Sequence, residues 1–178
     1  MHLALLRGIN VGGRNIIRQD ALREAFEELG FDDVRTYIQS GNVLFRVPKD
    51  RAADLRTDIE AHLSDCFGYS ALAVIKSARQ YRRAAASAHA GWGHDESRKH
   101  NAIFMGPELR ADRVVAKLPP LRDDLEQVST GPGAIFWSAS KDHISATTMM
   151  KFSRLDAYRQ VTVRNHKTTW KLLELLAG

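Results

Sequence analysis

The chain has 178 residues, of which 44% are hydrophobic and 26% are charged, and its formal net charge is +5 at pH 7. This composition is typical of a folded globular protein and excludes a disordered chain. The first apolar run, residues 3–6, is too short for a signal peptide or a bilayer span, so we expect no membrane contact. A single cysteine, Cys66, excludes an internal disulfide and favours a cytoplasmic location.

Hydrophobic periodicity predicts the elements of the first half. Residues 3–7 have the pattern of a strand, and the helix that follows ends at Gly30. Strands at 34–38 and 42–47 are joined by a hairpin at 39–41. Asp50 is the predicted cap of a second helix, which ends at Gly68 and carries Cys66 as a small buried residue. A strand at 72–76 and a helix from Ser77 to about residue 88 complete this half.

The same order recurs after a loop at 89–100 that is rich in glycine, histidine and tryptophan. The pattern predicts a strand at 101–105, a helix at 111–118, strands at 127–130 and 134–139, a helix near 149–155, a strand at 161–164 and a helix at 168–176. The repeated order indicates an α+β protein of two tandem ferredoxin-like (split β-α-β) units, 1–88 and 101–178, with 89–100 as the connection. Because the strands are apolar at successive positions, we expect each half to cover the other's sheet.

Split β-α-β topology places two polar segments at one edge of the first sheet, the loop after the first strand and the hairpin at 39–42. Glycines there allow positive φ angles, and backbone N–H groups, arginines and a helix start favour negative charge. The alternative is a tight turn whose asparagines satisfy backbone groups. The candidate ligand-binding residues are Arg7, Gly8, Asn10, Gly12, Gly13, Arg14, Asn15, Gln39, Ser40, Gly41 and Asn42.

The end of the chain is a second candidate region. Six basic and two acidic side chains in residues 151–178 give that segment a net charge of +4, nearly all of the total. A basic face of this kind favours contact with phosphates, although a solvated helix surface has the same composition. The candidate residues of this basic tail are Arg164, Asn165, Lys167 and Lys171.

Neither a metal nor a cofactor is expected. Glycines at positions 8 and 13 resemble a nucleotide-binding P-loop, but Arg14 and Asn15 replace its lysine and its hydroxyl residue. His89, His94 and His100 share a loop, and their spacing matches no ligand pattern, so we interpret them as solvated side chains.

Three runs carry a resemblance to a known family: LLRGINVGGRN at 5–15, TYIQSGNVLF at 36–45 and VTVRNHKTT at 161–169. With them the chain resembles the Domain of Unknown Function 1697 family of bacterial proteins, which implies an α+β fold and no known activity. The residues favour a non-catalytic binding protein for an anionic, phosphate-bearing ligand or nucleic acid. The alternatives are an enzyme acting on a phosphate-bearing or carboxylate substrate at the 8–15 loop, and a protein–protein adaptor.

Overall fold

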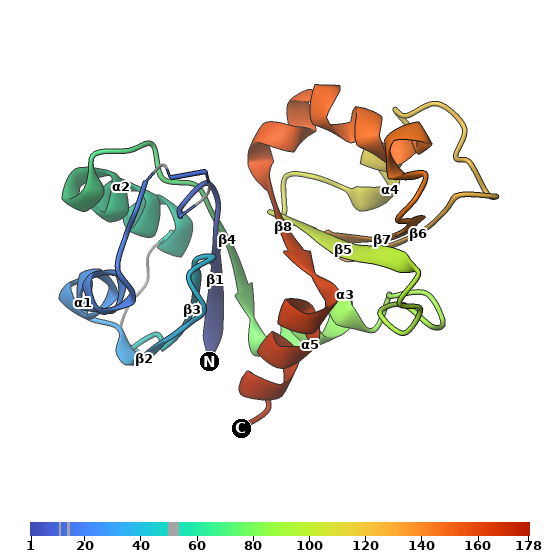
Figure 1. The fold of residues 1–178 in the computed structure, drawn as a ribbon. Coiled ribbons are helices and arrows are strands. Elements are labelled where there is room, and N and C mark those ends of the chain that lie inside the picture. Colours follow the sequence, from blue (N-terminus) through green and yellow to red (C-terminus); the bar gives the residue numbers. More distant parts are fainter. Residues whose placement is uncertain (11, 14, 50–53) are drawn as a thin grey trace. The chain divides into compact units, whose positions relative to one another are not determined.

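A computed structural model describes residues 1–10, 12–13, 15–49 and 54–178. Two of the residues named above, Arg14 and the predicted cap Asp50, lie outside these ranges. The chain divides into two compact units, Met1–Ala78 and Arg79–Gly178, each with one four-stranded antiparallel sheet and helices (Figure 1). The fold is therefore α+β, as predicted.

The first unit follows the predicted order of elements. These are β1 (His2–Leu6), α1 (Gln19–Glu28), β2 (Asp32–Tyr37), β3 (Asn42–Arg46), α2 (Leu55–Phe67) and β4 (Ala73–Ser77). The strand order across the sheet is β2-β3-β1-β4, and all neighbours are antiparallel. This order places the end of β1 beside the turn between β2 and β3, which is the arrangement that the sequence predicts.

Helices α1 and α2 lie on the same face of this sheet (Figure 1). Phe26 of α1 packs edge-on against Phe45 of β3, with 5.3 Å between ring centroids, and Ile59 of α2 joins the same core. Leu3 and Leu5, whose side chains point to the opposite face, are also fully buried. The prediction that the two halves cover each other's sheets stays a prediction.

Helix ends in the first unit agree with the predicted glycines but not with every predicted cap. Helix α2 ends at Gly68, whose φ is +66° and whose N–H donates to the Ser64 carbonyl. Its N-cap is Asp54, whose carboxylate accepts from the N–H groups of Arg56 and Thr57. Cys66 is exposed, which corrects the predicted burial, because this position near the end of α2 lies away from the core formed by Ile59 and Leu63.

The second unit holds the remaining elements: α3 (Ala78–Ala85, from its second residue onward), β5 (Arg98–Met105), α4 (Ala111–Val115), β6 (Glu126–Gly131), β7 (Ala134–Ser140), β8 (Val161–Asn165) and α5 (His166–Leu175). Its strand order, β6-β7-β5-β8, repeats the order of the first sheet. The predicted first half included α3. Here Tyr81 of α3 stacks on Phe104 of β5, and its hydroxyl donates to the Thr169 carbonyl at 3.0 Å. These contacts group α3 with the second unit.

Both faces of the second sheet are covered by elements of the same unit. Ile103, Ile135 and Trp137 pack with α4 and the segment that follows β7. On the opposite face Phe104 meets Tyr81, and Phe136 meets Trp92 at 5.0 Å between ring centroids. In this half, therefore, α3 and the loop after it cover sheet positions that the sequence analysis assigned to the other half.

The predicted helix near 149–155 is a series of 3-10 helices instead: η1 (Ile144–Ala146), η2 (Thr148–Arg154) and η3 (Asp156–Gln160). Met149, Phe152 and Leu155 are spaced by three residues, which is the period of a 3-10 helix. At its start the buried Glu126 carboxylate accepts from the N–H groups of Thr148 and Met149, at 2.7 and 3.1 Å. Across the described residues, every helix falls short of the length and apolar content needed to cross a membrane.

Candidate functional site

The structure brings together the two polar segments at the edge of the first sheet. The Asn10 side chain donates to the Gln39 carbonyl at 2.7 Å, and the Leu6 N–H donates to the Gly41 carbonyl at 2.8 Å. At Gly41 the φ angle is +73°, and an added Cβ would lie 2.8 Å from the Leu6 Cβ and the Ile9 Cδ1. Only glycine allows this close approach.

Polar side chains of this edge serve the loop's own backbone. Asn10 also donates to the Ile17 carbonyl at 3.0 Å and accepts from the Ile17 N–H at 2.9 Å. Asn15 donates to the Gly8 carbonyl, and the buried Asn42 donates to the Tyr37 carbonyl, both at 2.9 Å. Three asparagines therefore act as loop braces, as the turn alternative predicts. Of the other candidates, Gly8, Gly12, Gly13 and Gln39 are exposed, and Arg7 and Ser40 are half-buried.

A larger hollow lies in the second unit, where β5 begins and α5 begins. We call it the basic cavity; its volume is about 720 Å³. Its lining carries four lysine or arginine side chains against two carboxylates. The lining residues are Gly93, His94, Asp95, Glu96, Arg98, Lys99, His100, Asn101, Lys141, Asn165, His166 and Lys167.

The start of helix α5 forms one side of the basic cavity. Asn165 is the N-cap, and its side-chain oxygen accepts from the Thr168 N–H at 2.8 Å. The first N–H groups of a helix have no acceptor within the helix, and the helix dipole adds positive potential at this end. Lys167 stands in the first turn and is exposed. The backbone and the side chains here both favour an anion.

Aromatic packing holds this wall in place. The His100 and His166 rings meet edge to face at 5.4 Å, and Trp92 packs against Trp170 at the same centroid distance. Gly93 allows the close contact, because a Cβ there would lie 3.1 Å from the Trp170 Nε1. His100 of β5 and Gly93 of the preceding loop are thus fixed against the start of α5.

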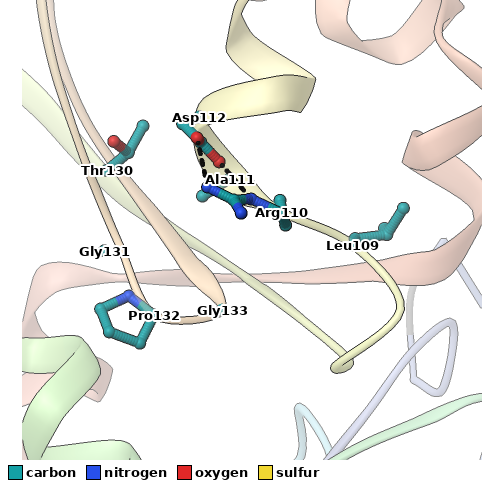
Figure 2. Close-up of a pocket in the computed structure, with 8 residues that line it drawn as sticks. All are labelled: Leu109, Arg110, Ala111, Asp112, Thr130, Gly131, Pro132 and Gly133. Atoms are coloured by element: carbon teal, nitrogen blue, oxygen red, sulfur yellow. Dashed lines mark hydrogen bonds and ion pairs between the residues drawn. The ribbon is translucent and has the colours of Figure 1, made fainter.

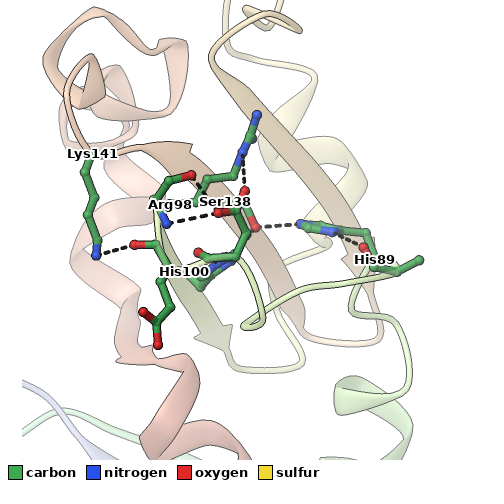
Figure 3. A network of polar contacts seen from close by, with 9 residues as sticks. His89, Arg98, His100, Ser138 and Lys141 are labelled. Carbon is green, nitrogen blue, oxygen red and sulfur yellow. Dashed lines mark hydrogen bonds and ion pairs between the residues drawn. The ribbon is translucent and has the colours of Figure 1, made fainter.

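Hydrogen bonds also hold His100 and its neighbours in place (Figure 3). His100 pairs with Ser138 at 2.7 Å through Nδ1, and its Nε2 lies 2.8 Å from the Asp95 carbonyl oxygen. His89 reaches the same hydroxyl at 2.9 Å, and Lys141 donates to the Glu96 carbonyl. His100 is only 3% exposed. The interpretation of His100 as a solvated loop residue is wrong, because β5 begins at Arg98 and pairs this polar stretch with β7.

The electrostatics of the basic cavity favour negative ligands. Partial burial, followed by the charges of His100, Lys167, Lys141 and His94, lowers the pKa of His166 below 6.5. Of the two acids, Asp95 is engaged: it accepts from the Ser97 N–H and hydroxyl and forms an ion pair with Arg98 at 3.6 Å. These Ser97 hydrogen bonds are the main reason that the pKa of Asp95 lies below its usual value.

The predicted basic tail separates into residues with different surroundings. Asn165 and Lys167 line the basic cavity. Arg164 is buried instead of facing solvent; it donates to the Thr162 hydroxyl at 2.7 Å, and burial lowers its pKa to about 10. Lys171 pairs with Glu174 on the exposed side of α5 at 2.8 Å. A single basic face over these four residues is therefore not formed.

Two further hollows in the second unit are less suited to an anion. One, of about 390 Å³, lies between the start of α4 and the β6–β7 hairpin (Figure 2). Its charged side chains, Arg110 and Asp112, pair with each other at 2.9 Å. The other, of about 180 Å³, is mostly apolar and includes Trp137 and Met149.

Comparisons with known proteins bear on the family and the fold of this chain. The two antiparallel sheets with helices and the basic cavity define an α+β protein with a candidate binding site. Residues 1–136 match the model of the family described as "Protein of unknown function (DUF1697)", and the chain belongs to that family, as the resemblance predicts. The motifs at 5–15 and 36–45 lie within the matched residues, and the motif at 161–169 lies beyond them. The residues of α5 lie beyond the matched segment.

A solved structure extends the similarity over nearly the whole chain. It is described as that of a conserved bacterial protein from Streptococcus pneumoniae, with 30% sequence identity and a TM-score of 0.83. The alignment covers 98% of this chain and 97% of that one. No curated protein matches the chain.

The sequence signals for the basic cavity were present but separate. Histidines and acids at 89–100, Lys141 and the motif at 161–169 are far apart along the chain. The pairing of β5 with both β7 and β8 brings them together. No local pattern predicts that arrangement.

Proposed function

We propose that this protein is a non-catalytic binding protein for a small anionic, phosphate-bearing ligand, held in the basic cavity of the second unit. One observation carries the proposal: four basic side chains and the start of a ten-residue helix line a cavity of about 720 Å³. Phosphate oxygens accept hydrogen bonds from backbone N–H groups and from ammonium or guanidinium donors together.

Binding is favoured over catalysis by the surroundings of Ser138. Ser138 is the serine hydrogen-bonded to His100 of this cavity, yet the residue is 1% exposed. Both His89 and His100 contact that hydroxyl. A substrate has no path to it, so the serine positions the two rings.

The loops at the edge of the first sheet are kept as a second candidate location. In the first of these loops Gly8, Gly12 and Gly13 are exposed, and Arg14, which lies outside the described residues, supplies a guanidinium that stays charged at neutral pH. If the anion binds here, Arg14→Ala weakens binding by roughly tenfold to a hundredfold, since a hydrogen bond to a charged group contributes about 1.5–3 kcal/mol.

Calorimetry separates the two locations. The full-length chain is titrated with pyrophosphate and with sulfate, and Lys141→Gln and Lys167→Gln are compared with Lys171→Gln. Each cavity variant is expected to bind roughly tenfold to a hundredfold more weakly. Lys171 is the matched control, because it stands on the same helix and pairs with Glu174 away from the cavity. Equal affinity in all of these variants contradicts the proposal.

A nucleic acid is the alternative outcome of the same test. A short single-stranded oligonucleotide is titrated at two salt concentrations, because neutralised phosphates release counterions and affinity then falls steeply with salt. Oligonucleotide binding that exceeds pyrophosphate binding and is lost in Lys167→Gln identifies nucleic acid as the ligand.

We further propose that both units are ferredoxin-like, which their shared strand order supports, and that the protein is cytoplasmic.

A further inference from the structure

Three different metal-binding side chains meet on the outer side of the first unit. His62 and Cys66 are four residues apart on α2, so they share one face of that helix, and Glu28 is the last residue of α1. One ligand atom from each lies within 4.8 Å of the other two. In the part of the chain that the structure describes, this is the one group of three or more histidine, cysteine or acidic residues so arranged.

The ring nitrogen Nε2 of His62 lies close to both Glu28 and Cys66. The His62 Nε2 lies 3.1 Å from a Glu28 carboxylate oxygen and 3.4 Å from the Cys66 sulfur. One N–H group cannot direct its proton well at two acceptors, and a nitrogen lone pair cannot attract a carboxylate oxygen. A cation between the three atoms would satisfy the nitrogen, the oxygen and the sulfur at once.

Two of the three spacings between ligand atoms are close to those of tetrahedral zinc. Zinc lies about 2.3 Å from thiolate sulfur and about 2.0–2.2 Å from imidazole nitrogen or carboxylate oxygen. Tetrahedral angles then separate pairs of ligand atoms by about 3.4–3.6 Å. The two distances from the His62 Nε2, 3.1 and 3.4 Å, are close to these values before any adjustment. The exposed Glu28 side chain is free to rotate its oxygen toward the sulfur, since it is 63% accessible.

The chemistry of the donor set selects the ion. A thiolate with an imidazole and a carboxylate suits a borderline-soft cation such as Zn²⁺ better than Ca²⁺ or Mg²⁺, which prefer oxygen ligands. Glu28 and Cys66 are exposed, so the fourth position is open to solvent.

We propose that Glu28, His62 and Cys66 form a Zn²⁺ site with three protein ligands and one open position, which joins the end of α1 to α2. This site revises the sequence-based expectation of no metal. It does not depend on the proposed function, because it lies in the other unit and uses different residues.

Cobalt substitution tests the ligand set directly. The full-length chain is freed of metal with a chelator and titrated with Co²⁺. Cys66 is the sole cysteine, so a thiolate-to-Co²⁺ charge-transfer band can arise from it alone. We expect that band, together with tetrahedral visible absorption, to saturate at one Co²⁺ per chain and to disappear when one equivalent of Zn²⁺ is added. A titration without the charge-transfer band overturns the proposal.

Variants then test each ligand by competition with a chromophoric zinc chelator. Cys66→Ser and His62→Gln are expected to weaken Zn²⁺ binding at least about a hundredfold, because loss of even an outer-shell partner of a zinc ligand costs 10–100-fold. Glu28→Gln is expected to weaken it at least about tenfold. Glu27→Gln is the matched control, since Glu27 stands one residue earlier and pairs with Arg23. Zinc affinity that is unchanged in Cys66→Ser and His62→Gln would mean adventitious surface binding and would refute the site.

Discussion

Replacing Asn10 with alanine tests whether the first polar loop is held by its own asparagines. The Asn10 side chain makes three hydrogen bonds, to the Gln39 carbonyl, the Ile17 carbonyl and the Ile17 N–H, at 2.7, 3.0 and 2.9 Å. Its φ angle is +53°, in the left-handed region that asparagine tolerates and alanine disfavours. The substitution removes both contributions.

The expected loss of stability follows from those contacts. Each hydrogen bond contributes about 0.5–1.5 kcal/mol net, and the contact with Gln39 is exposed and so belongs at the lower end. Alanine at positive φ adds a cost of about 1 kcal/mol. We therefore expect Asn10→Ala to lower the free energy of unfolding of the first unit by about 2.5–4.5 kcal/mol.

Two companion variants divide that loss. Asn10→Gly keeps the left-handed backbone and loses the three hydrogen bonds. Asn10→Asp keeps the acceptor for the Ile17 N–H and loses the two donated bonds. We expect the order of stability to be wild type, then Asp, then Gly and Ala. Gly and Ala are expected to differ little, because the flexibility of glycine in the unfolded chain offsets its backbone advantage.

Urea unfolding measures these values with two signals. All three tryptophans, Trp92, Trp137 and Trp170, belong to the second unit, so their fluorescence reports that unit, whereas far-ultraviolet circular dichroism reports both. We expect the dichroism transition to move to lower urea. If Asn10→Ala and Asn10→Gly both remain within about 0.5 kcal/mol of wild type, the asparagine is not a brace, and its side chain is available to a ligand.

Four further predictions follow from particular contacts. In urea unfolding, Gly41→Ala is expected to lower the free energy of unfolding by at least about 2 kcal/mol more than Gly13→Ala does. Both glycines have φ of +73°, but of the two only Gly41 has atoms within 4 Å of the added Cβ. Equal losses contradict this prediction. Ile38→Asn is expected to raise the melting temperature with a gain of about 0.5–1 kcal/mol, since Ile38 has φ of +49° and is exposed; a lower melting temperature is the opposing result. Glu126→Ala leaves buried N–H groups without their acceptor and is expected to cost about 3–5 kcal/mol by tryptophan fluorescence, so a loss below about 1 kcal/mol would be inconsistent with it. A bound anion favours the charged form of His166, whose pKa in the free protein lies below 6.5. Sulfate affinity measured by calorimetry is therefore expected to rise as the pH falls from 8 to 6. In His166→Gln this rise is expected to be smaller.

Much of the secondary structure could be predicted from the sequence, because it is determined by short-range physics. Short apolar runs and turn residues located the strands of the described residues, and Gly30 and Gly68 marked helix ends, since both adopt positive φ. The adjacency of the 8–15 loop and the 39–42 hairpin also followed, because strand order restricts which segments share an edge. The predicted helix near 149–155 was wrong in type, since the buried Glu126 carboxylate fixes its first turn from 22 residues away.

Burial and the candidate sites were decided by tertiary structure. His100 stands in a stretch whose composition is typical of a loop, but the pairing of β5 with β7 places it opposite Ser138 and buries it. Arg164 has a charged side chain, yet it is buried beside Thr162. Cys66 was expected to be buried, yet it is exposed. It lies near His62, and the end of α1 brings Glu28 next to both. The sequence by itself determined the order of elements, the family and the net positive charge. Only the folded chain decided which charges meet, because a binding site depends on distances between residues that local propensity does not encode.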